Sequence, residues 1–405
     1  MVPIAIARTG GTRGRSFGPL RPDHEGILDL PPGFSYRVIG RAGTPMSDGW
    51  RAPAKPDGMA CFSGRDGQWV LMRNHEVAPH DTSLGPFQVG AAPAEAFDGA
   101  AYGGVTRLVI DPKSAQVISS NLVLAGTSRN CAGGPSPWGW LSCEEAGDEA
   151  GHGYVFLCDV EAPRVRAPVR LGGYGRFNHE AAAIEPSTDI AYLTEDRPDG
   201  CLYRFVPTDR RAPFVGRLQA LRVVGVDGAS TRDWVAGQVA DVEWVDIDEP
   251  DPRDDTLRRE AQGKGAATIR RGEGIWYHRD VVLDRGEIWF TATEGGPAGT
   301  GQIFRLLRGP GGDRLEVVVH SDDAAMLDLP DNVTFSPGGQ LFVCEDGKDG
   351  NFLRALTSDR TLVPFARGAL SPSELAGVCF SPDGRVMFVN LQHDGLTLAV
   401  TGPFA

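Results

Sequence analysis

The sequence predicts an all-β protein, a six-bladed β-propeller with a short helical insertion. Among its 405 residues are 53 Gly and 30 Pro, which show no regular period and separate many short runs rich in Val, Ile, Phe, Tyr and Trp. One hairpin-like unit recurs six times along the chain. Further strand-like runs lie between the units, enough to complete blades of four strands.

Each recurring unit begins with an acidic or amide residue and continues through a short apolar strand. A turn of Gly, Pro or Asp follows, and then a second apolar strand that ends in another acidic or amide residue. The turns at 336–339 (SPGG) and 381–384 (SPDG) place Pro at the second turn position and Gly where positive φ is favourable. Each unit therefore predicts a β-hairpin. The six units are residues 57–76, 130–145, 180–196, 273–294, 331–346 and 374–392.

The polar residues at the ends of the hairpins predict a metal site. In an antiparallel hairpin, the residue before the first strand and the residue after the second lie at the same end. If the hairpins form the innermost strands of six blades, about twelve carboxylate and amide groups meet at one central opening. Carboxylates so crowded would repel one another unless cations neutralise them, and calcium prefers oxygen ligands. The alternative is that these acidic residues are solvated turn residues.

The domain organisation follows from the repeat. We expect an N-terminal extension at residues 1–29, a single propeller domain at 30–405, and an insertion between the third and fourth blades at 206–270. Within the insertion, residues 254–264 predict a short polar helix that precedes Arg270 and Arg271. Because 34–41 and 397–402 both resemble strands, one terminus can complete a blade that the other begins.

Charge and motifs exclude several classes of protein. The net charge of −13 disfavours nucleic acid as a specific partner, because phosphate backbones are bound by an excess of Lys and Arg. No apolar run is long enough to span a membrane, and seven scattered cysteines do not predict a disulfide framework. The patterns G-x-S-x-G, C-x-x-C and G-x-x-x-x-G-K-[ST] are missing from the sequence. We expect a monomer that acts on small molecules.

Two residues outside the strands suggest chemistry. Cys131 occupies a position in the ligand series within a Gly-rich stretch, and a thiolate among carboxylates favours a softer ion such as iron. The alternative is a small buried thiol. Arg271, two residues before Glu273, suits an anionic substrate, because a guanidinium forms paired hydrogen bonds with phosphate oxygens. The alternative is an arginine of the rim that pairs with a neighbouring carboxylate.

Nine sequence blocks, in order from about Gly33 to Phe404, resemble the PhoX-type alkaline phosphatase family. They are LMRNHE, NCAGGPSPWGWLSCEE, GRFNHEAAAIEP, AYLTED, CLYRF, RGEGIWY, FTATEGG, PDNVTFSPGGQLFVCEDG and ELAGVCFSPDGRVMFVN. The resemblance implies a six-bladed propeller that hydrolyses phosphate monoesters. It also implies a central cluster of iron and calcium ions with a bridging oxo or hydroxo group as the nucleophile.

The resemblance also implies roles for individual residues. Cys131 matches an iron ligand, and Arg271 with Glu273 matches the catalytic pair whose arginine contacts the substrate phosphate. Glu273 is also an implied metal ligand. The remaining implied metal ligands are Glu144, Glu180, Glu195, Glu294, Glu345, Glu374, Asn130 and Asp331, with Glu76, Asn332 and Asp346 as further candidates. The chain is shorter than the best-known members and resembles a compact branch of the family.

The family implies a periplasmic or secreted protein exported by a twin-arginine signal, whereas residues 1–22 lack the apolar stretch of a signal peptide. Two other functions fit the propeller. One is a calcium-dependent lactonase or esterase, which needs few ligands and no thiolate. The other is a binding propeller without enzymatic activity, in which metals only stabilise the fold.

Overall fold

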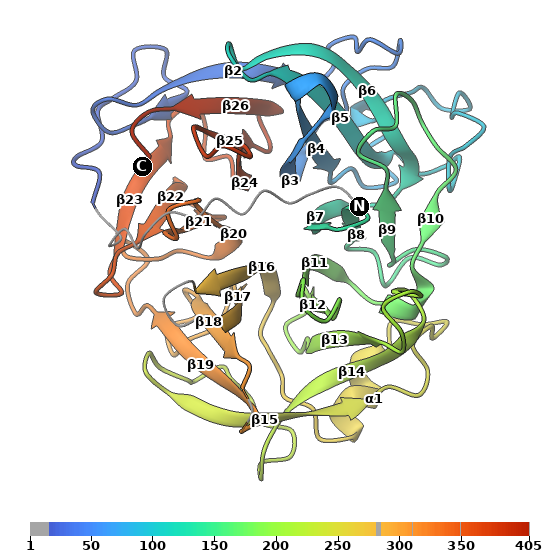
Figure 1. Cartoon of the computed structure of the whole chain (residues 1–405), viewed down its shortest axis with the longest axis vertical. Helices are drawn as coiled ribbons and strands as arrows, with labels where there is room; N and C mark the ends of the chain where they lie inside the picture. Colours follow the sequence, from blue (N-terminus) through green and yellow to red (C-terminus); the bar gives the residue numbers. More distant parts are fainter. Residues whose placement is uncertain (1–15, 281–284, 310, 349, 405) are drawn as a thin grey trace. The chain divides into compact units, whose positions relative to one another are not determined.

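The computed structural model describes residues 16–280, 285–309, 311–348 and 350–404, and the predicted all-β class is confirmed (Figure 1). Within these residues, strands dominate; the helical elements are α1 (Leu257–Gly263) and the short 3₁₀ helices η1 (Arg65–Gly67), η2 (Thr82–Leu84) and η3 (Gly172–Tyr174). No helix in this part of the chain is long and apolar enough to cross a membrane. The chain divides into two compact units, residues 1–142, 156–169 and 334–405, and residues 143–155 and 170–333.

The first unit contains two complete four-stranded antiparallel sheets. One has the order β3-β4-β5-β6, with bounds Pro56–Ser63, Trp69–His75, Gly103–Asp111 and Gln116–Thr127. The other has the order β2-β26-β25-β24, with bounds Ser35–Arg41, Leu396–Thr401, Val386–Leu391 and Leu375–Phe380. Strand β24 packs against β3, so the two sheets are neighbours within this unit.

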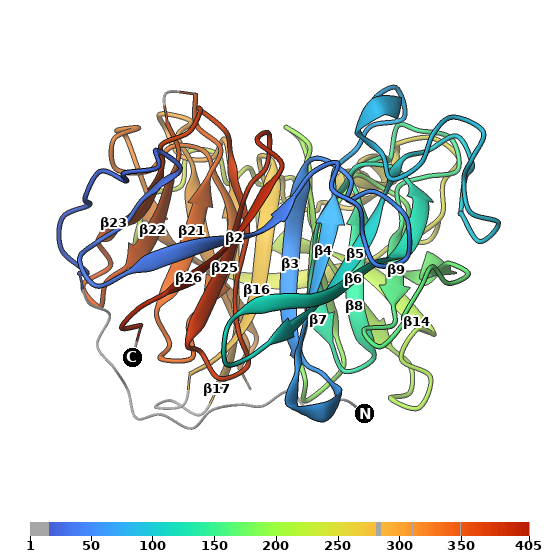
Figure 2. The same cartoon turned by 90° about the horizontal axis from the view of Figure 1, so that it is seen from above.

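The two ends of the chain meet in one sheet, as predicted from the sequence. Strand β2 pairs antiparallel with β26, and Figure 2 shows the two strands running side by side. Leu398 and Val400 of β26 are fully buried in a core shared with Phe342 and Phe365. The expectation that one terminus completes a sheet begun by the other is therefore confirmed. Of the expected N-terminal extension, residues 1–15 lie outside the described residues, and Leu28–Asp29 form β1, which pairs with β23.

The second unit is built on a nine-stranded sheet of order β11-β12-β13-β14-β15-β19-β18-β17-β16. Strand β15 lies between β14 and β19 and joins two sets of four strands, while the first strands of the two sets, β11 and β16, also contact each other. The bounds in this order are His179–Ile184, Ala191–Glu195, Leu202–Pro207, Gly216–Val223, Val239–Asp246, Asp313–His320, Gln302–Leu307, Arg285–Ala292 and Gly272–Asp280. The segment expected as an insertion, 206–270, contains β14, β15 and the predicted helix, α1.

Two further sheets complete the strand inventory of the described residues. One has the order β10-β9-β8-β7, with bounds Val169–Arg170, Val155–Cys158, Gly139–Glu144 and Asn130–Ser136. The other has the order β1-β23-β22-β21-β20, in which the last four strands have bounds Leu362–Gly368, Phe352–Leu356, Leu341–Glu345 and Pro330–Phe335. All six predicted hairpins are present, because the two strands of each are neighbours in a sheet.

Candidate active site

Three buried carboxylates lie in β-bulges at the start of the first strand of their hairpins. Asp57, Glu180 and Glu273 each fall where the pairing register shifts, between 56 and 59, 179 and 182, and 272 and 275. A bulge interrupts the alternation of side chains along a strand and changes the direction in which one of them points. All three side chains are nearly inaccessible to solvent. The bulges thus supply the local reason why acidic residues are buried at these strand ends.

A glycine follows two of these acidic residues, Asp57 and Glu273, and allows the first strand of the following hairpin to approach closely. A Cβ atom on Gly58 would lie 2.5 Å from the Cα atom of Ala132, and one on Gly274 would lie 2.7 Å from the Cα atom of Asn332. Both distances are too short for any side chain, so only glycine permits this packing. The Asp-Gly and Glu-Gly pairs therefore bring Cys131 beside the first bulge and Asp331 beside the other.

The first unit holds a group of one thiol and two carboxylates. Ligand atoms of Asp57, Glu76 and Cys131 all lie within 4.8 Å of one another. Nε2 of Gln392 donates hydrogen bonds of 3.0 Å to both carboxylates, at Oδ2 of Asp57 and Oε2 of Glu76. Burial raises the pKa of Glu76, and Lys55 and the hydrogen bond from Gln392 oppose this shift. Such a set of donors, one soft and two hard, suits a transition metal ion.

The second unit holds a group of three carboxylates. Ligand atoms of Glu180, Glu273 and Asp331 lie within 4.8 Å of one another, and all three residues are buried. Burial, together with the charges of Asp196 and Asp331, raises the pKa of Glu273 well above its usual range, while Arg271 opposes the shift. A bound cation would offset this repulsion, and an all-oxygen donor set suits a hard ion such as calcium.

Side chains of the same unit hold this group in place. Nδ2 of Asn332 donates a 2.9 Å hydrogen bond to Oδ1 of Asp331, which orients that carboxylate. The hydroxyl of Thr194 donates to the backbone carbonyl of Glu273 at 2.5 Å, and the hydroxyl of Thr291 donates to that of Asp331 at 2.7 Å. These hydroxyls fix the backbone of two neighbouring strands at the positions where the carboxylates emerge.

Arg271 lies at the edge of the three-carboxylate group. Its Nη2 donates a 2.8 Å hydrogen bond to Oε1 of Glu273, and its Nε and Nη2 also donate to the two carboxylate oxygens of Asp196. Arg271 therefore forms the ion pairs with neighbouring carboxylates that the alternative interpretation expected. Nη1 has no protein acceptor among the described residues, and a quarter of the side chain is exposed. The Nη1 edge of the guanidinium thus keeps hydrogen-bond donors for an anion.

Three glutamates at the ends of second hairpin strands accept hydrogen bonds from protein groups. Glu144 accepts from His152 at 2.7 Å and from the backbone of Gly153 at 2.9 Å. Glu195 accepts from the hydroxyl of Tyr203 at 2.8 Å and from the backbone of Cys201 at 3.0 Å.

Glu345 follows the same pattern. It accepts from Nε of Arg354 and, at 3.2 Å, from the backbone of Phe352. Within the described residues, neither it nor the glutamates at 144 and 195 belongs to a group of three potential ligands.

The remaining predicted ligands have separate surroundings. Glu294 is partly exposed and pairs with Arg270 at 2.8 Å. The amide of Asn130 is buried between Thr127, which donates to its Oδ1, and Ser142, which accepts from its Nδ2. Glu374, immediately before β24, is half-buried, and its backbone carbonyl accepts from the backbone of Gln392 at 3.1 Å.

Asp57 and Asp196 were not among the site residues predicted from the sequence. Asp57 is the first residue of the first recurring unit, and this position could have identified it as a potential metal ligand. Asp196 is the second residue of an acidic pair, as is Glu145, which accepts a 2.7 Å hydrogen bond from Asn178. Consecutive residues of a strand point to opposite sides, so each acidic pair offers one member to either side. The sequence does not indicate which member of a pair points toward the potential metal ligands.

Comparisons with known proteins place the chain in a family. The family model described as alkaline phosphatase PhoX matches residues 15–121 and 113–395. Among curated protein sequences no significant match was found. The structure of Pseudomonas fluorescens PhoX in complex with vanadate, a transition state analogue, is 18% identical in sequence; the match has a TM-score of 0.74 and covers 97% of this chain and 98% of that one.

A gluconolactonase from Xanthomonas campestris is 12% identical, with 97% of this chain and 100% of that chain covered. Its TM-score of 0.48 is too low to support an argument for lactone chemistry. The match to the family model extends over almost all of the chain, and the PhoX structure matches 97% of it in fold. The chain therefore belongs to the alkaline phosphatase PhoX family, and it is a phosphatase of this type.

Proposed function

We propose that the protein is a metal-dependent phosphatase that hydrolyses phosphate monoesters of small molecules. The observation that carries the proposal is the buried group of Glu180, Glu273 and Asp331 with the guanidinium of Arg271 hydrogen-bonded to one of its members. An arginine beside a cation site is a suitable arrangement for binding a phosphoryl group.

The two groups of potential ligands suit different ions. The thiol of Cys131 with two carboxylates favours iron, and the three carboxylates of the other group favour calcium. When bound, such cations would neutralise phosphate oxygens and activate an oxygen nucleophile.

The protein's own residues bind and orient the substrate. Arg271 carries one positive charge between two carboxylates, Asp196 and Glu273, so these three side chains together have a net negative charge when both carboxylates are ionised. A phosphate dianion would be repelled by them alone, which is why the proposal requires cations. Nη1 of Arg271 donates a hydrogen bond to a phosphate oxygen in this arrangement, while Asp196 fixes the plane of the guanidinium.

Four further points extend the proposal. We propose six blades, in which the nine-stranded sheet comprises two, β11–β14 and β16–β19, with β15 as an additional strand between them. We also propose that residues 30–405 form one propeller domain, and that the protein acts as a monomer. Export to the periplasm or beyond is proposed from the family. The recurrence of hairpins and of strand-end bulges supports the six blades.

Phosphatase assays on the purified protein test the proposal. Hydrolysis of p-nitrophenyl phosphate is measured with and without chelator, beside a panel of lactones, and elemental analysis gives the metal content. We expect iron and calcium, with phosphatase turnover that is lost on chelation and restored by the metals. Turnover in a metal-free protein, or hydrolysis of lactones without hydrolysis of phosphate esters, would contradict the proposal.

A further inference from the structure

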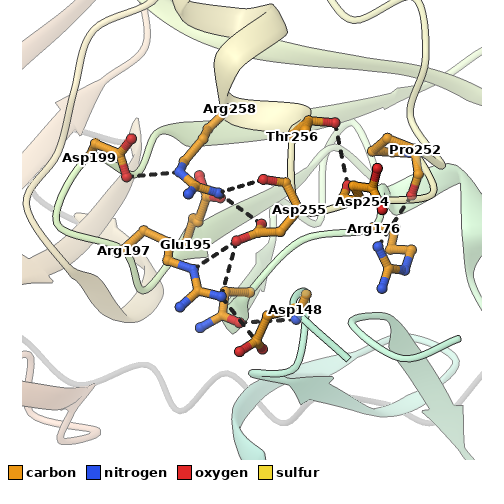
Figure 3. Close-up of polar contacts among 12 residues, drawn as sticks. Asp148, Arg176, Glu195, Arg197, Asp199, Pro252, Asp254, Asp255, Thr256 and Arg258 are labelled. Atoms are coloured by element: carbon orange, nitrogen blue, oxygen red, sulfur yellow. Dashed lines mark hydrogen bonds and ion pairs between the residues drawn. The ribbon is translucent and has the colours of Figure 1, made fainter. Parts of the chain in front are cut away.

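Helix α1 contacts the 196–200 turn, the connection between β12 and β13, through polar side chains. Its residues Leu257 and Ala261 are fully buried, and Nε2 of Gln262 donates a 2.6 Å hydrogen bond to the backbone carbonyl of Asp199. Figure 3 shows the side chain of Arg258 reaching from the helix to this turn. The helix predicted within the insertion is therefore attached to the 196–200 turn and can hold that turn in place.

Arg258 forms the centre of the contact. Its Nε donates to Oδ1 of Asp199 and its Nη1 to Oδ1 of Asp255, both at 2.8 Å, and Oε1 of the buried Glu195 lies 3.8 Å from Nη1 (Figure 3). Arg258 is itself only 8% exposed. Glu195 ends β12, Asp199 lies in the turn and Asp255 lies just before α1, so the single arginine joins these three segments.

A second arginine strengthens the same contact. Nη2 of Arg197, inside the turn, lies 3.1 Å from Oδ2 of Asp255 and 3.5 Å from Oδ1 of Asp148. Asp255 therefore bridges one arginine of the turn and one of the helix. Networks of buried or half-buried charges resist displacement better than isolated surface pairs, because removing one member leaves others without compensation.

The braced turn holds both the side chain and the backbone of Arg271. Asp196 accepts the paired hydrogen bonds from the guanidinium, and the carbonyl of Arg197 accepts from the backbone N–H of Arg271 at 2.9 Å. The carbonyl of Gly200 accepts from Ile269 at 2.8 Å. Arg271 has φ of 50°, a left-handed conformation that is costly for a residue with a side chain and persists only where the surroundings enforce it.

We propose that Arg258 is a positioning residue for Arg271 and acts through the 196–200 turn. The inference rests on the proposed function, in which Arg271 contacts the phosphoryl group. A small shift of the turn would move Asp196, and with it the plane of the guanidinium, away from the phosphate oxygen. Misplacement of a binding group by about 1 Å is enough to lower catalytic efficiency by up to about 100-fold.

The test compares Arg258→Gln with Lys264→Gln, a control at the other end of the same helix. The ammonium of Lys264 forms ion pairs with Asp248 and Glu260 and donates to the carbonyl of Asp246, and none of these residues belongs to the turn. We expect Arg258→Gln to raise both the KM for p-nitrophenyl phosphate and the inhibition constant of inorganic phosphate by about 10-fold. The control changes both by less than about twofold, and Arg258→Lys, which keeps the charge without the fork, gives an intermediate effect.

A double-mutant cycle distinguishes positioning from a general structural role. In an Arg271→Ala background, Arg258→Gln should lower kcat/KM by less than about twofold, because the residue through which it acts is gone. An equal loss in both backgrounds would overturn the proposal.

Hydrogen exchange of the backbone amides at 269–271 provides a measurement that is independent of activity. Arg258→Gln should accelerate exchange at Ile269 and Arg271 by about 10-fold relative to the wild type, and Lys264→Gln should not. Unchanged exchange in a folded Arg258→Gln protein would overturn the inference. If that variant does not fold, Asp199→Asn provides the same test. Asp199 is half exposed, and its substitution removes the ion pair with Arg258, so exchange at Ile269 and Arg271 should again accelerate. A wild-type protein without phosphatase activity would instead contradict the proposed function.

Discussion

Asp196 holds the guanidinium of Arg271 through two hydrogen bonds, from Nε to Oδ1 at 2.8 Å and from Nη2 to Oδ2 at 2.9 Å. The same Nη2 donates to Glu273 at 2.8 Å. The arginine is therefore fixed in plane by one carboxylate and joined to the three-carboxylate group by another. This geometry gives Arg271 a defined orientation before any substrate is bound.

Arg271→Lys should lower kcat/KM for p-nitrophenyl phosphate by about 100-fold, because an ammonium keeps the charge but loses the planar fork. Steady-state kinetics at constant metal concentration measure the effect. The matched control is Arg270→Lys, whose partly exposed pair with Glu294 should matter by less than about threefold. Equal losses in the two variants would contradict a specific role for Arg271.

Cys131→Ser should lose iron while calcium is retained, because the hydroxyl replaces the only soft donor of its group. Asp331→Asn should show the reverse pattern, since it removes a charge from the all-oxygen group. Elemental analysis of both purified variants measures the two metals. Cys61→Ser, at a half-buried thiol, is the control. Undiminished iron in Cys131→Ser would exclude the thiol as its ligand.

Glu345→Gln should reduce stability and leave the metal content unchanged. The carboxylate pairs with Arg354 in the interior, and removing one member of a buried ion pair costs about 3 kcal/mol. Urea unfolding and elemental analysis together separate the two effects. Glu294→Gln, at a partly exposed ion pair, is the control and should lower the free energy of unfolding by less than about 1 kcal/mol. A stable variant that has lost metal would show that Glu345 is a ligand after all.

His179 should make the protein sensitive to acid. Its Nε2 hydrogen-bonds to the carbonyl of Gly175 at 3.0 Å, its ring stacks on Phe177, and its Nδ1 has no hydrogen-bond partner among the described residues. Burial lowers its pKa from 6.5 to about 3, and the hydrogen bond to Gly175 opposes the shift. Between these values the unfolded chain binds a proton that the folded protein does not, so the free energy of unfolding falls as the pH drops below 6.5.

The contribution of His179 to this slope should approach about 1.4 kcal/mol per pH unit, and His179→Gln should lower the slope by that amount. Urea unfolding from pH 7.5 to 4.5 in the presence of chelator measures the slope without a contribution from metal release. His80→Gln, at an exposed histidine, serves as the matched control. The same slope in wild type and His179→Gln would assign the acid sensitivity to other groups.

Local pattern in the sequence was sufficient for the six hairpins, whereas for β2 and β26 it indicated two strands whose pairing only the fold brings about. Strand pairing across a short turn depends on residues that are close in sequence, such as the Ser-Pro-Asp-Gly turn before β25. The Glu-Gly pair at 273–274 likewise marks a place where only glycine permits close packing, although the bulge itself was not predicted.

The amino-acid sequence by itself determined the all-β class, the hairpin boundaries, and the proximity of Arg271 to Glu273, because each depends on neighbours along the chain. Only the tertiary structure decided which member of each acidic pair faces which side, since a shift of one residue reverses the direction of a strand side chain. It also decided that Asp196 binds an arginine 75 residues away and that Asp57 and Glu76 lie beside Cys131. Such contacts depend on how separate strands pack, which no local pattern encodes.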